Sequence, residues 1–180
     1  MKRFINNKIR VLILHPIGTY GGASKSIYEL VKAVHSKKIN FYFLTQKGNV
    51  EQYFEKVGTV ISSPGLIQFS DTKYGFYRGL RWFILIRELY YFMFTIWALI
   101  KLRINTDIDI IHLNEITGLP TLILAKLFFK IPAIVHVRSL ARNDLNSKRS
   151  KFILWYLKNQ CDKIIAIDEN VKSSLSPDLK

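Results

Sequence analysis

Short apolar runs alternate with stretches of helical periodicity along almost the whole chain. Six runs rich in branched and aromatic side chains predict β-strands, at residues 9–14, 39–44, 57–62, 109–113, 133–137 and 163–167. The stretches between them predict helices, at residues 27–34, 50–57, 77–104, 119–129, 152–159 and 169–175. Because several strands are apolar on both faces, we expect an α/β fold, with a doubly wound parallel sheet covered by helices on each face.

The loop between the first strand and the first helix contains Gly18, Gly21 and Gly22. A strand, a tight glycine loop and a helix N-terminus together aim backbone N–H groups at an anion such as a phosphate. Gly21 and Gly22 would let a ligand approach the backbone, because no Cβ stands in its way. The alternative is that these glycines only turn the chain between strand and helix.

Two named phosphate-binding motifs do not match this loop. A Walker A loop needs a glycine directly before its Lys-Ser pair, but Ser24 precedes Lys25 here. The dinucleotide fingerprint G-x-G-x-x-G is broken directly after Gly18. The loop is therefore suited to phosphate without being an ATPase or dehydrogenase signature.

The charge balance narrows the classes of partner. The chain has 180 residues, enough for one domain, and carries a formal charge of +14, with 27 Lys+Arg against 13 Asp+Glu. Such an excess favours nucleic acid, anionic lipid or phosphorylated substrates. We expect no nucleic acid, because the cations are spread along the chain and no recognition motif is present.

The cysteine content and the N-terminus indicate the compartment. The single cysteine, Cys161, excludes an internal disulfide and suits a reducing cytosol. The N-terminus lacks the apolar core of a secretory signal.

Residues 77–104 form a basic and aromatic stretch. Cations flank it, namely Arg78, Arg81, Lys101 and Arg103. Its uncharged run, 89–100, is too short for the roughly 20 residues of a bilayer span, and a longer one would take Arg87 and Glu88 into lipid. We therefore expect an interfacial helix at the cytoplasmic face of an anionic membrane. The alternative, a helix packed against the sheet or a partner domain, is compatible with it.

Four segments, in chain order, resemble family 4 glycosyltransferases of the GT-B fold. They are GTYGGASKSIYEL at 18–30, DIDIIHLNEITGLPTLILAK at 107–126, IPAIVHVRSL at 131–140 and CDKIIAIDENVKSSL at 161–175. The resemblance implies a Rossmann-like, acceptor-side N-terminal domain covering residues 1–180. It implies that the family's C-terminal, donor-binding domain is absent, so that the chain is a domain, a truncated product or one subunit of a split enzyme.

The implied reaction moves a sugar from a nucleotide-diphosphate donor to a lipid-linked or polysaccharide acceptor. We expect the chain alone to be inactive, because the missing half, or a partner chain, would hold most of the donor. The alternative function is a non-catalytic, membrane-docking subunit that recruits a separate donor-binding protein. We expect no cofactor and no metal. Asp107-Ile108-Asp109 has the letters of a metal motif, but it precedes a buried strand and so falls at the wrong end of the sheet.

Candidate catalytic residues follow two of the strands. In the family, a residue at the exit of the strand at 133–137 contacts the donor sugar or assists catalysis, and it is typically His. Here Arg138 takes that position and His136 falls two residues earlier, on the same side of the strand. Arg138 suits a phosphate better than proton transfer, because it stays charged. The alternative is a packed histidine and an ordinary surface charge. Glu115, just past the strand at 109–113, is the third candidate, and we expect it to contact an acceptor hydroxyl.

The remaining candidates line the glycine loop. Gly21, Gly22 and Ala23 are expected to bind the donor phosphates through their amides. Expected acceptor-side residues are His15, Ser24 and Asn114, although Ser24 could equally support the start of the helix. His112, inside a buried strand, is expected to be a hydrogen-bonded structural histidine.

Overall fold

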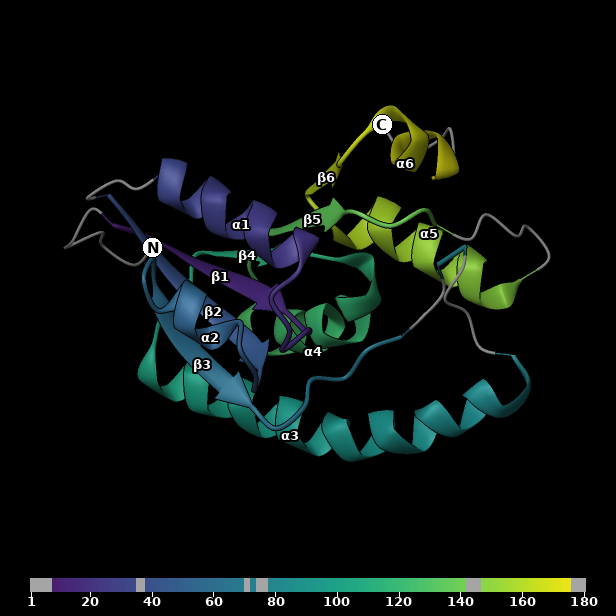
Figure 1. Ribbon diagram of the computed structural model, residues 1–180, viewed down its shortest axis with the longest axis horizontal. Coiled ribbons are helices and arrows are strands. Elements are labelled where there is room, and N and C mark those ends of the chain that lie inside the picture. The colour runs from purple at the N-terminus through teal and green to yellow at the C-terminus, as the bar shows by residue number, and fades with distance from the viewer. Residues whose placement is uncertain (1–7, 35–37, 70–71, 74–77, 142–146, 176–180) are drawn as a thin grey trace.

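The computed structural model describes residues 8–34, 38–69, 72–73, 78–141 and 147–175 (Figure 1). Its six strands are β1 (Ile9–His15), β2 (Ile39–Gln46), β3 (Thr59–Ser63), β4 (Ile110–Leu113), β5 (Ala133–Val137) and β6 (Lys163–Ala166). They form one sheet in the order β3-β2-β1-β4-β5-β6, and every neighbouring pair is parallel. The predicted Rossmann-like fold is therefore confirmed.

The helices lie where the sequence predicts them, although the ends of most of them differ from the predicted ones. They are α1 (Gly22–Ala33), α2 (Glu51–Phe54), α3 (Ile84–Asn105), α4 (Leu119–Phe129), α5 (Lys148–Gln160) and α6 (Glu169–Ser174). The predicted helix at 77–104 begins instead as a 3₁₀ helix, Gly79–Phe83, while Tyr77 lies outside the described residues. α5 starts earlier than predicted, because Ser147 caps it by accepting from the Ser150 amide at 3.4 Å.

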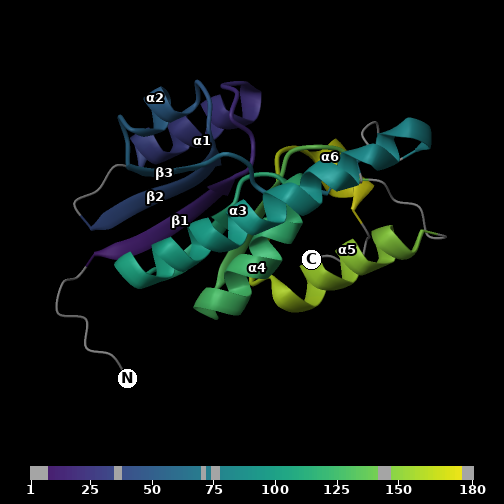
Figure 2. The same ribbon diagram turned by 90° about the horizontal axis from the view of Figure 1, so that it is seen from below.

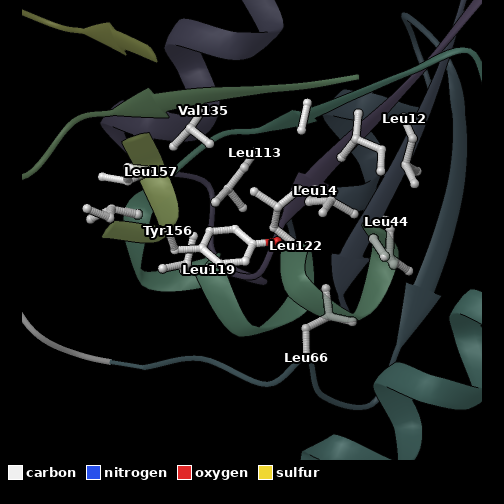
Figure 3. Packing of buried hydrophobic residues seen from close by; sticks show 14 of the residues in the cluster. Leu12, Leu14, Leu44, Leu66, Leu113, Leu119, Leu122, Val135, Tyr156 and Leu157 are labelled. Carbon is white, nitrogen blue, oxygen red and sulfur yellow. The ribbon is translucent and has the colours of Figure 1, made fainter. Parts of the chain in front are cut away.

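The sheet is covered on both faces, by α1 and α2 on one side and by α3, α4 and α5 on the other (Figure 2). Successive residues of β1 point to opposite faces, so Ile13 packs under α1 while Leu12 and Leu14 pack on the other side. The larger core brings Leu12 and Leu14 together with Leu66 and Leu122 (Figure 3). This burial on both faces explains why the strand is apolar throughout.

A charged cluster closes the amino end of the sheet; it consists of Arg10, Asp107 and Asp109 and is called the amino-end cluster below. Asp109 accepts from the Arg10 amide at 2.8 Å and from its Nε at 3.0 Å. Asp107 lies 3.4 Å from the same guanidinium. Both carboxylates of the Asp-Ile-Asp segment are thus engaged in ion pairs at the end of the sheet where the sequence places them.

Candidate functional site

Polar side chains from three strand exits meet at the carboxyl end of the sheet. His15 ends β1, Asn114 and Glu115 follow β4, and Arg138 follows β5. The strand order places β4 between β1 and β5, so residues far apart in the sequence become neighbours. We call His15, Asn114, Glu115, His136 and Arg138 the carboxyl rim. In open α/β sheets, ligands bind at this end.

Asn114 is the centre of the rim. Its Nδ2 donates to His15 Nδ1 at 3.0 Å and to the Ala23 carbonyl at 3.1 Å, and its Oδ1 accepts from Arg138 Nε at 3.0 Å. A carbonyl can only accept and a guanidinium can only donate, so these partners fix the orientation of the amide. His15 Nδ1 therefore accepts, and the ring carries its proton on Nε2.

His15 uses that proton to hold the glycine loop. Its Nε2 lies 2.9 Å from Ser24 Oγ, and the Ser24 hydroxyl donates to the Thr19 carbonyl at 3.1 Å. His15 is fully buried, and burial together with the charge of Arg138 lowers its pKa to about 4. His15 and Ser24 are thus brought to the loop as predicted, but both are buried parts of its support.

Arg138 lies half-buried among neutral acceptors. Besides Asn114, its guanidinium donates from Nη2 to His136 Nδ1 at 3.1 Å, which places Arg138 and His136 on the same side, as predicted. Arg138 Nη1 is buried without a hydrogen-bond partner, and the guanidinium has no ion pair with a described residue. Burial lowers the pKa of Arg138, but an arginine stays charged at neutral pH. The charge of Glu115 acts on Arg138 and opposes this lowering, although the two side chains form no ion pair.

His136 is a hydrogen-bond donor at neutral pH. Burial and the nearby charge of Arg138 lower its pKa to about 4. Because Nδ1 accepts from Arg138, the neutral ring carries its proton on Nε2. This group can donate to an anion or a hydroxyl, but at neutral pH it is a poor proton donor in acid catalysis, because it is already uncharged.

Glu115 faces inward. Only 5% of the residue is exposed; its Oε1 accepts from the Ile116 amide at 2.7 Å and its Oε2 from the Ser139 hydroxyl at 2.9 Å. Burial raises the pKa of Glu115, while those hydrogen bonds and Arg138 oppose the rise. The carboxylate therefore ties the β4 exit to the β5 exit. Sequence reasoning missed Ser139, although its place directly after Arg138 at the strand exit was a usable signal.

His112 departs from its prediction. It is buried, as expected for its strand, but its Nε2 has no hydrogen-bond partner among the described residues. Its ring stacks on that of His136, with 6.0 Å between the centroids. Burial and the charges of its neighbours lower its pKa to about 4, so the ring is uncharged at neutral pH.

The twin glycines do not need to be glycine for the chain's own packing. A Cβ on Gly21 or Gly22 would meet no atom within 4 Å, and neither residue has a positive φ. Gly18, by contrast, sits where a Cβ would clash with the Lys47 carbonyl. Gly21 and Gly22 therefore leave room beside the start of α1, where the Gly21 amide donates to Ser24 Oγ at 3.4 Å and the first amides of the helix have no acceptor inside it.

The fold resembles that of a solved cyanobacterial protein. Three crystal structures of Anabaena Alr3699/HepE, with UDP-glucose, with UDP, and with UDP and glucose, superpose with TM-scores of 0.61, 0.60 and 0.60 at 13% sequence identity. Each match covers 92% of this chain but only 39–40% of the other one, so the chain spans about 40% of the length of these structures. At 13% sequence identity, this similarity shows a shared fold and nothing more. No curated protein shows significant sequence similarity to the chain.

The profile of Glycosyltransferase Family 4 matches residues 20–179, nearly the whole chain. The match includes all of the carboxyl rim except His15, as well as the glycine loop from Tyr20 onward. The chain belongs to Glycosyltransferase Family 4.

Proposed function

We propose that this chain is the acceptor-side domain of an enzyme that moves a sugar from a nucleotide-diphosphate donor to a lipid-linked or polysaccharide acceptor. The observation that carries the proposal is the half-buried guanidinium of Arg138 at the carboxyl rim, whose Nη1 has no hydrogen-bond partner among the described residues. It is joined through Asn114 to a glycine loop that leaves room at the start of α1. Departure of a nucleoside diphosphate requires groups that stabilise negative charge, and this arrangement supplies them. The HepE structures, which hold UDP or UDP-glucose, are consistent with a donor of this class.

The rim residues have two kinds of role, binding the donor and positioning the groups that bind it. Arg138 and the amides of Gly21, Gly22 and Ala23 face the donor diphosphate, and His136 donates from Nε2 to the donor sugar or its phosphate. Asn114, His15 and Ser24 position these groups, because their hydrogen bonds join the glycine loop to Arg138. Glu115 is a positioning residue, since both of its oxygens are occupied within the chain.

An apolar cavity favours the lipid-linked acceptor over a free polysaccharide. It has a volume of about 330 Å³ and starts beside the rim, because its wall includes Ile116, the residue after Glu115. Leu119, Pro120, Ile123, Phe69, Phe152 and Ile153 line the rest, together with Lys148 and Arg149. Apolar walls with two cations suit the hydrocarbon chain and phosphate of an anionic lipid carrier.

Sugar transfer is tested on the 180-residue chain, assayed alone and together with a donor-binding half supplied on the same polypeptide or as a partner. Radiolabelled UDP-glucose, UDP-galactose and GDP-mannose are offered with a bacterial lipid extract. We expect label in the lipid fraction only when the donor-binding half is present. Transfer by the chain alone would contradict the proposed division of labour. No transfer with any donor by the folded, completed enzyme would favour a non-catalytic docking subunit.

A further inference from the structure

Helix α3 has two apolar faces, and the domain buries only one of them. Its outward face carries a stripe of large exposed side chains at every third or fourth position: Ile86, Leu89, Met93, Trp97, Ile100 and Ile104. Trp82, in the 3₁₀ helix before α3, continues this spacing. Leu89, Met93 and Trp97, at its middle, are 71%, 66% and 60% exposed. A helix on the surface of a domain normally presents polar side chains to water. The stripe on α3, roughly 30 Å long by the helical rise, is thus an exposed apolar surface that the described residues do not cover.

The inward face fixes α3 to the domain. Leu99 is fully buried in the larger core, and the Ile67 amide donates to Thr95 Oγ at 2.9 Å. Glu88, 3% exposed, accepts from the Gln68 amide at 2.7 Å. By length and composition alone, Gly79–Asn105 is a helix that could cross a membrane. Crossing would break these contacts with the rest of the domain and take Glu88 into lipid, which argues against a spanning helix.

Cations and aromatic rings accompany the stripe at both ends. Arg81 lies near its start, and Lys101 near its end places Nζ 5.4 Å from the Trp97 ring centre. α5 is on the same face of the sheet as α3 (Figure 2), and its Arg149 lies 5.4 Å from the Trp82 ring. α5 adds two exposed rings and three exposed lysines, namely Phe152, Trp155, Lys148, Lys151 and Lys158. Tryptophans between an apolar belt and cations match the boundary of hydrocarbon and anionic headgroups.

We propose that the outward face of α3, continued by Phe152 and Trp155 of α5, is a docking surface for an anionic phospholipid bilayer. The helix lies in the headgroup layer with its stripe toward the acyl chains. The net charge of +14 supplies the attraction that selects anionic over zwitterionic lipid. Phe152 also lines the cavity proposed for the acceptor, but the α3 stripe lies outside that cavity, so vesicle binding can be tested without the sugar-transfer reaction.

Vesicle flotation of the 180-residue chain tests this surface. We expect the chain to float with vesicles of phosphatidylcholine and phosphatidylglycerol, and to stay behind with phosphatidylcholine alone. Replacing Leu89 and Trp97 by serine should weaken binding about a hundredfold or more, because each apolar side chain contributes about tenfold or more. Arg81→Gln with Lys101→Gln should weaken it roughly tenfold or more, at about 1 kcal/mol per cation.

The matched control is Leu30→Ser with Val34→Ser, at the C-terminal end of α1. Both residues are 45% exposed, and α1 covers the opposite face of the sheet. We expect this variant to float like the parent chain. An equal loss in the control, or no flotation of a chain that circular dichroism shows to be folded, would overturn the proposal. So would equal flotation with both vesicle types, or a dimer that the Leu89 and Trp97 substitutions dissociate without any vesicle binding.

Alkaline carbonate extraction separates a surface helix from a spanning one. We expect carbonate to release the vesicle-bound chain into the supernatant, because α3 keeps its inward contacts. A chain that stays in the vesicle pellet would show that α3 inserts, and would overturn docking at the surface.

Discussion

An arginine lies at each end of the sheet, and the groups that contact the two arginines differ. At the amino end, Arg10 contacts Asp107 at 3.4 Å and Asp109 at 3.0 Å, and these carboxylates raise its pKa. At the carboxyl end, Arg138 contacts the neutral Asn114 and His136, and burial lowers its pKa. Arg10 is paired directly with two carboxylates, whereas Arg138 interacts with the Glu115 carboxylate without forming an ion pair with a described residue.

This difference separates a stabilising cluster from a candidate binding site. A surface charge in an ion pair within the chain contributes modestly to stability and is not available to bind a ligand. A half-buried charge among neutral acceptors costs stability unless an anion joins it. The carboxyl rim also contains two histidines, His15 and His136, that burial and Arg138 keep neutral. Arg138 is therefore the cation that the rim can offer to a diphosphate, with Glu115 as the opposing charge.

The largest expected effect is on sugar transfer. In the enzyme completed by a donor-binding half, Arg138→Gln should lower the transfer rate roughly a hundredfold to a thousandfold, since it removes the charge facing the leaving group. Arg10→Gln is the matched control at the other end and should keep most of the activity. Initial rates with saturating acceptor measure both. Equal losses in the two variants would remove the distinction between the two ends.

Asn114→Leu should lower the free energy of unfolding by about 3 kcal/mol, because His15, Ala23 and Arg138 each lose a hydrogen-bond partner. The control is Asn105→Leu, at the exposed end of α3, where the amide donates only to the Lys101 carbonyl. Urea denaturation should show a change below about 0.5 kcal/mol there. If Asn114→Leu cost no more than the control, the rim would not be a connected network.

Stability should fall as the pH drops from 6.5 toward 4. Burial lowers the pKa of His15 from 6.5 to about 4, so in this window the unfolded chain binds the proton and the folded chain does not. At pH 5 this residue alone should cost about 2 kcal/mol relative to pH 8. Urea midpoints at both values measure the fall, which His15→Gln should reduce. A midpoint that stays constant from pH 8 to pH 5 would show that these histidines titrate normally.

The smallest effect belongs to the amino-end cluster. Asp109→Asn should cost about 1 kcal/mol, because the pair with Arg10 is partly exposed to solvent. Arg10 lowers the pKa of Asp109 below 3.8, so its contribution is present above that pH and is lost only as the pH falls further. Urea midpoints at pH 7 and pH 3 should therefore differ less in the variant than in the parent. A variant with an unchanged difference would show that the pair adds nothing.

The sequence was sufficient for the strands and for their parallel direction, because runs such as residues 9–14 and 133–137 are largely apolar on both faces. It did not predict the order of the strands in the sheet. It was not sufficient for the contacts of the rim. His15 and Asn114 are 99 positions apart, and they meet only because β1 and β4 are neighbours in the right register. The inward direction of Glu115 depends on the 3₁₀ helix Ile116–Gly118, which periodicity did not reveal. Periodicity likewise did not reveal that His112 Nε2 lacks a hydrogen-bond partner or that its ring packs against His136.

The most direct measurement is a titration of the isotopically labelled chain with inorganic pyrophosphate, followed by amide and arginine Nε resonances. The account predicts shifts at Gly21, Gly22, Ala23 and the Arg138 side chain, and none at Arg10 or Asp109. Shifts confined to the amino end, or the same response in Arg138→Gln as in the parent chain, would contradict it.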